Sequence, residues 1–66
     1  MRIIVNGNEQ QLTDRTSIAA LLKIVGVHPE QVVAEHNGQI IAADHYGKIY
    51  LSDGDTIELI QFVGGG

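Results

Sequence analysis

Cysteine is absent from the 66 residues of this chain. Its absence excludes disulfides, a thiolate nucleophile and any zinc or iron–sulfur site built on cysteine. The fold must therefore be stabilised by its core, and 44% of the residues are hydrophobic, most of them Ile, Val and Leu. A chain of this length forms one domain, which buries only about 60% of its unfolded surface.

Basic residues are also scarce. Arg2, Arg15, Lys23 and Lys48 stand against eight acidic residues, which gives a net charge of −4. Nucleic-acid binding needs clustered Lys and Arg, so we expect no nucleic acid as a partner and favour a basic protein surface instead.

Long hydrophobic runs are missing as well. The apolar residues near the N-terminus stop at Asn6-Gly7, which is too early for a signal peptide or a membrane span. We therefore expect a cytoplasmic protein with no membrane partner, and the lack of cysteine is compatible with a reducing compartment.

The first 26 residues predict a hairpin and then a helix. Alternation around Ile3 to Val5 predicts a strand, Asn6-Gly7 a type I′ turn, and residues 9–13 a polar return strand at an edge. Thr16 is the predicted helix cap. The apolar residues that follow it at helical spacing are Ile18, Leu21, Leu22 and Val25, and Gly26 is expected at the C-terminal cap.

The second half predicts four more extended segments. Residues 32–36 and 39–42 form a hairpin around Asn37-Gly38, residues 43–48 a connector with one helical turn, and residues 49–51 a brief extended piece. Asp53-Gly54-Asp55 is a predicted turn before the last strand at 56–62. One helix must cover one face of a mixed sheet, so the predicted class is α+β. We expect a β-grasp with a four- to five-stranded sheet, the last strand central and next to the first.

The last strand places apolar side chains on the face that no helix covers. If Ile57 and Leu59 face the helix, then Glu58, Ile60 and Phe62 lie on the other face beside Ile4. These four residues are our predicted partner-docking patch, with Asp53, Asp55 and Glu58 as an acidic rim. The alternatives are that the apolar residues merely shield the sheet, and that each acid is a solvated turn or strand residue.

No group of residues predicts catalysis. His28, His36 and His45 are spaced too widely for a typical zinc site, and we expect them to be surface or loop residues without a metal. Asp53-Gly54-Asp55 lacks the further ligands of a calcium loop, and neither Ser17 nor Ser52 has a base beside it by sequence. We therefore expect that the protein is not an enzyme and binds no cofactor.

The unusual reactive group is a carboxylate on a glycine tail. Val63 precedes Gly64, Gly65 and Gly66, and we expect residues 1–62 to form the domain and 63–66 a flexible tail. Residues without side chains fit a narrow channel in a partner enzyme. Attack of a Gly66 carboxylate oxygen on the α-phosphate of ATP would transfer the adenylyl group, release pyrophosphate and give an acyl adenylate open to nucleophilic attack.

The sequence resembles the ThiS-type sulfur carrier proteins of thiamine biosynthesis, which are ubiquitin-like. The resemblance extends over nearly the whole chain. The segments that carry it are Ile3 to Gly7, the helix with Leu21-Leu22, residues 28–38, Asp53-Gly54-Asp55 with the strand after it, and Val63 to Gly66. The chain departs from the family's usual pattern at Ala42-Ala43, where members often have a proline.

The resemblance implies a mechanism and partners. An adenylating enzyme uses Mg·ATP to activate Gly66, with Val63, Gly64 and Gly65 inserted into it. A sulfur donor such as a cysteine desulfurase then supplies sulfur to give a thiocarboxylate, and thiazole synthase receives it. The alternatives are a carrier like the small subunit of molybdopterin synthase, a ubiquitin-like modifier of lysines, and a binding module with an incidental glycine tail.

Overall fold

The structure, a computed structural model, describes residues 1–62. Five strands form one sheet in the order β2-β1-β5-β3-β4. The strands are β1 (Arg2–Val5), β2 (Asn8–Gln11), β3 (Val32–His36), β4 (Gln39–Ile41) and β5 (Thr56–Gln61). One α-helix, α1 (Ile18–Val25), and two short 3₁₀ turns, η1 (Pro29–Gln31) and η2 (Ala43–His45), complete the elements.

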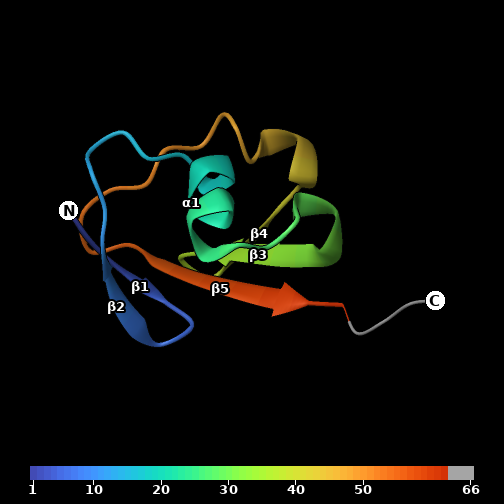
Figure 1. The fold of residues 1–66 in the computed structure, drawn as a ribbon, viewed down its shortest axis with the longest axis horizontal. Coiled ribbons are helices and arrows are strands. Elements are labelled where there is room, and N and C mark those ends of the chain that lie inside the picture. Colours follow the sequence, from blue (N-terminus) through green and yellow to red (C-terminus); the bar gives the residue numbers. More distant parts are fainter. Residues whose placement is uncertain (63–66) are drawn as a thin grey trace.

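The sheet has the predicted β-grasp arrangement. β5 is central, parallel to β1 and antiparallel to β3, and both outer pairs are antiparallel hairpins. Asn6-Gly7 and Asn37-Gly38 have positive φ at both positions, as the predicted type I′ turns require. Helix α1 and the connection from β4 to β5 lie on the same side of the sheet (Figure 1). No helix of the described part of the chain covers the other side.

The buried core lies between this helix and the sheet. The predicted stripe of α1 packs inward, with Ile18, Leu21 and Leu22 fully buried and Val25 partly buried. Within residues 1–62, the buried apolar residues are Ile3, Val5, Leu12, Ile18, Leu21, Leu22, Val32, Ala34, Tyr46, Leu51 and Ile57. Sheet residues that alternate with these therefore point to the opposite face.

The start of α1 differs from the prediction. Ser17, one residue after Thr16, is the N-cap, and its hydroxyl accepts a hydrogen bond from the Ala20 N–H at 3.1 Å. Thr16 is buried instead, and its hydroxyl donates to the Thr13 carbonyl at 2.8 Å. Both residue types cap helices well, so local preference alone does not separate two neighbours. Gly26 has a φ of 82° and is the left-handed cap, as predicted.

The side chain of Tyr46 bonds to the backbone of β3 next to the end of β4. Its buried hydroxyl donates to the Val32 carbonyl and accepts from the Ala34 N–H, both at 3.2 Å, and Ala34 is in the last β3–β4 pair, with Ile41. The segment 49–51, predicted as extended, contributes one isolated bridge between Tyr50 and Ser17. This connection therefore closes one edge of the core through the Tyr46 side chain and one isolated bridge rather than through a further strand.

Candidate functional site

The predicted reactive residue Gly66, with Val63, Gly64 and Gly65, lies outside the described residues. The structure does describe the strand that leads to them. β5 pairs with β1 at Thr56 and Ile57, and with β3 from Ile57 to Gln61, which lies opposite Val32. The Phe62 N–H then donates to the Gln31 carbonyl at 2.9 Å. The position from which the chain continues toward Gly66 is therefore set by the central strand.

The Asn6 side chain bonds to the backbone of β5 at Leu59, on the edge opposite to β3. β1 ends at Val5, and the Asn6 side chain takes its place along β5. Its Oδ1 accepts from the Leu59 N–H at 2.7 Å, and its Nδ2 donates to the Leu59 carbonyl at 3.3 Å. The sequence marked Asn6 as a turn residue and gave no reason to expect this second role.

The predicted docking patch lies on one face. Glu58, Ile60 and Phe62 are exposed, with 55% of Ile60 and 59% of Phe62 accessible. Ile4 is half-buried on β1 and pairs with Thr56, so it lies at the end of β5 away from Phe62 and not beside Ile60 and Phe62 as expected. Ile57, on the opposite face, is 1% exposed. The predicted orientation of β5 is thus confirmed, and contact of these four residues with a partner stays a prediction.

Two of the three predicted rim acids lie near Ile4 and away from Ile60 and Phe62. Asp53 and Asp55 precede β5, whereas Phe62 follows it, about 20 Å away along an extended strand. Asp53 Oδ1 accepts from the Arg2 N–H at 2.7 Å, so it ties the turn to β1. Asp55 is neither a rim residue nor a solvated one, because its carboxylate is bound within the fold.

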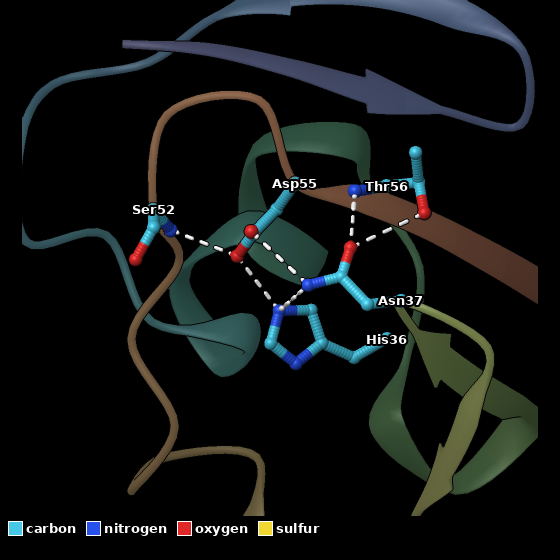
Figure 2. Close-up of polar contacts among 5 residues, drawn as sticks. All are labelled: His36, Asn37, Ser52, Asp55 and Thr56. Carbon is cyan, nitrogen blue, oxygen red and sulfur yellow. Dashed lines mark hydrogen bonds and ion pairs between the residues drawn. The ribbon is translucent and has the colours of Figure 1, made fainter.

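The carboxylate of Asp55 is the centre of a hydrogen-bond network with residues of the β3–β4 hairpin (Figure 2). Its Oδ2 lies 2.7 Å from His36 Nε2 and accepts from the Ser52 N–H at 2.9 Å. Asn37 Nδ2 donates to Oδ1 at 3.1 Å, and Asn37 Oδ1 accepts from the Thr56 N–H at 2.9 Å. The network joins the turn before β5 to β3 at the end of β5 away from Phe62.

This network corrects the expectation for His36. The side chains of His36 and Asp55 are 18% and 14% exposed, so His36 is a largely buried partner of a carboxylate rather than a surface residue. No short sequence pattern joins positions 36 and 55. The sequence shows a turn after His36, at Asn37-Gly38, and a turn before Asp55, at Asp53-Gly54. Only the register of β3 with β5 shows that the two turns lie next to each other.

The pKa of Asp55 lies below its ordinary value of 3.8. Burial alone would raise it, but hydrogen bonds from His36, the Ser52 backbone and Asn37 outweigh this effect. A carboxyl whose folded-state pKa is lowered stabilises the fold at pH values above its unfolded pKa. That contribution is lost as the pH falls from about 4 through the folded-state pKa.

We therefore expect Asp55→Asn to lower the free energy of unfolding at pH 7 by about 1–3 kcal/mol, because charged hydrogen bonds are lost. The difference from the parent protein should shrink as the pH falls below about 4. Urea unfolding at pH 7 and pH 3 measures both. Asp44→Asn, which removes the same charge from an exposed position in η2, is the control. An equal loss for Asp55→Asn at both pH values would contradict the role of the charged carboxylate.

A shallow groove lies beside the end of β5, on the helix side. Its volume is about 280 Å³, and its lining residues are Val5, Asn6, Asn8, Gln10, Val25, Val27, Leu59 and Gln61. The groove offers amide groups and an apolar floor but, among these residues, no charged side chain for a phosphate. Residues 1–62 also show no cluster of three or more potential metal ligands, and no helix among them is long and apolar enough to cross a membrane.

These features define a ubiquitin-like β-grasp protein whose central strand leads to a glycine-rich end. The chain belongs to the ThiS family, which it matches over residues 3–66. The match includes the four residues beyond the described fold.

Individual relatives agree with this assignment. The chain is 38% identical to the sulfur carrier protein ThiS of Bacillus subtilis over 53 residues, which is 80% of each protein. The crystal structure of the thiamine biosynthesis protein ThiS from Geobacter metallireducens superposes with a TM-score of 0.85 at 29% identity, and all of both chains is covered. Two thiazole synthases also match the whole chain.

These two relatives are much longer. The thiazole synthase of Paramagnetospirillum magneticum is 33% identical and that of Magnetococcus marinus 35% identical over 66 residues. In each case the chain spans 20% of the length of the relative.

Proposed function

We propose that this protein is a sulfur carrier that supplies the sulfur of the thiamine thiazole and carries it as a thiocarboxylate on Gly66. The observation that carries the proposal is the family match over residues 3–66, which includes the glycine tail as well as the fold. The names of the B. subtilis and G. metallireducens relatives, a sulfur carrier protein and a thiamine biosynthesis protein, support the same pathway.

The proposed reaction has two steps, both catalysed by partners. A carboxylate oxygen of Gly66 attacks the α-phosphate of ATP, and pyrophosphate leaves to give an acyl adenylate. Sulfur at the oxidation level of sulfide then attacks the carbonyl carbon, and AMP leaves to give the thiocarboxylate. The adenylating enzyme holds Mg·ATP and stabilises the developing charge. The carrier supplies the carboxylate and the surface by which it is held, and is itself not a catalyst.

The proposed partners follow from this chemistry. The adenylating enzyme contacts Ile4, Glu58, Ile60 and Phe62 and takes Val63, Gly64 and Gly65 into its active site. A sulfur donor such as a cysteine desulfurase delivers the sulfur as a persulfide, and a thiol reductant supplies the two electrons that bring it to the oxidation level of sulfide. A thiazole synthase is the acceptor, which the two thiazole synthases with a matching segment support.

Reconstitution tests the proposal. The purified protein is incubated with the adenylating enzyme of its own organism, Mg·ATP and sulfide, and its intact mass is measured. We expect the mass of one sulfur-for-oxygen exchange, dependent on ATP. An unchanged mass would favour a binding module, and adducts linked to lysine in cell extract would favour a protein modifier.

A further inference from the structure

Two carboxylates face each other on the uncovered side of the sheet. Glu35 of β3 and Glu58 of β5 are direct partners in the antiparallel register. The buried residues Ala34 and Ile57 precede them on their strands, so both glutamates point away from α1. In such pairs the Cβ atoms are about 4.5–5.5 Å apart, and like charges destabilise the sheet.

Among the described residues, no Lys or Arg side chain forms an ion pair with Glu35 or Glu58. Among residues 1–62 the ion pairs are Arg2 with Glu9 and His36 with Asp55. The remaining basic residues lie on other parts of the fold. Arg15 stacks over Tyr50 before the helix, Lys23 is in the last turn of α1, and Lys48 is in the connection after η2. We therefore expect the repulsion between Glu35 and Glu58 to lower the stability of the unbound protein.

Apolar side chains surround the two carboxylates. Ile40 of β4 is the cross-strand partner of Glu35 and is 73% exposed. The next pair toward Phe62 is Val33 with Ile60, of which Val33 is half-buried and Ile60 exposed. A partner that covers these side chains excludes water from the carboxylates as well. Two charges desolvated in this way need a cation in the same contact.

We propose that the uncovered sheet face docks on a protein surface that places an arginine against Glu35 and Glu58. Arginine suits the site better than lysine, because its planar guanidinium reaches two carboxylates at once and is more weakly hydrated. The proposal rests on the proposed function for the identity of the partner, the adenylating enzyme. It deepens that function by assigning Glu35, Val33 and Ile40 to the contact and by defining the chemistry that the contact recognises.

The test compares Glu35→Gln, Glu58→Gln and the double variant with Asp44→Asn, which removes one charge away from the sheet face. In the unbound protein, relief of the like-charge pair should raise Tm by about 1–6 °C in either single variant. The affinity for the adenylating enzyme, measured by calorimetry without ATP, should fall roughly 10- to 100-fold, because a desolvated charge on the partner loses its counterpart. Asp44→Asn should change neither.

Chemical protection identifies the cation. Phenylglyoxal modifies accessible arginines, and we expect the parent protein, but not the double variant, to protect one arginine of the enzyme. Unchanged affinity in the glutamine variants, or protection of a lysine alone, would overturn the inference while the parent protein is still converted to the thiocarboxylate. Failure of the parent protein to be converted would instead overturn the proposed function, and this inference with it.

Discussion

Deletion of Gly66 is expected to abolish thiocarboxylate formation without lowering Tm. Removal of one residue withdraws the carboxylate by about 3.3 Å. Because a displacement of 1 Å at a reacting group costs on the order of 100-fold in rate, the loss should be at least that large. The described fold gives no reason for a loss of stability, because its buried apolar residues all lie between Ile3 and Ile57.

The measurements are the rate of ATP-dependent mass change and thermal unfolding by circular dichroism. Gly66→Ala is the matched control, because it keeps the carboxylate in place and adds one methyl group. We expect it to retain part of the activity. A large fall in Tm on deletion of Gly66 would show that the tail supports the fold, which contradicts its assignment as a separate functional segment.

The second large expected effect is a loss of stability on substitution of Ile57, which lies on the buried face of β5. Ile57→Ala should lower the free energy of unfolding by about 2–5 kcal/mol, because the side chain is 1% exposed and its loss leaves a cavity. Domains of this size are typically stable by only a few kcal/mol, so a large fraction of this variant should be unfolded at 37 °C. Urea unfolding measures the change.

Ile60→Ala is the matched variant on the same strand. Its side chain is 55% exposed, so the stability should change by no more than about 0.5 kcal/mol. If the docking patch is correct, its conversion by the adenylating enzyme should nevertheless fall, with KM raised at least about 10-fold. Normal conversion of Ile60→Ala would remove Ile60 from the docking contact, and a strong loss of stability would contradict the assignment of the two faces.

Most of the fold could be predicted from local patterns. Asn6-Gly7 and Asn37-Gly38 require positive φ at both residues, and the apolar spacing from Ile18 to Val25 defines a helix face. With one helix and several strands, few arrangements bury both apolar faces, which is why the central position of β5 was predicted correctly.

The features that were missed depend on contacts between distant residues. His36 and Asp55 are 19 positions apart, and Asn6 and Leu59 are 53 apart. Tyr46 fell in a segment predicted as a connector, yet its hydroxyl pairs with the backbone of β3. In each case the residue type allows several partners, and the register of the sheet selects one. The pair Glu35 and Glu58 likewise becomes visible only when that register is known.

Localisation of the added sulfur tests the central claim most directly. The protein is converted with the adenylating enzyme, Mg·ATP and sulfide, and is then fragmented in a mass spectrometer. We predict that the fragments containing the C-terminal residue carry one sulfur in place of one oxygen and that the modification maps to Gly66. Sulfur attached at any other residue, or no sulfur after verified consumption of ATP, would contradict the account.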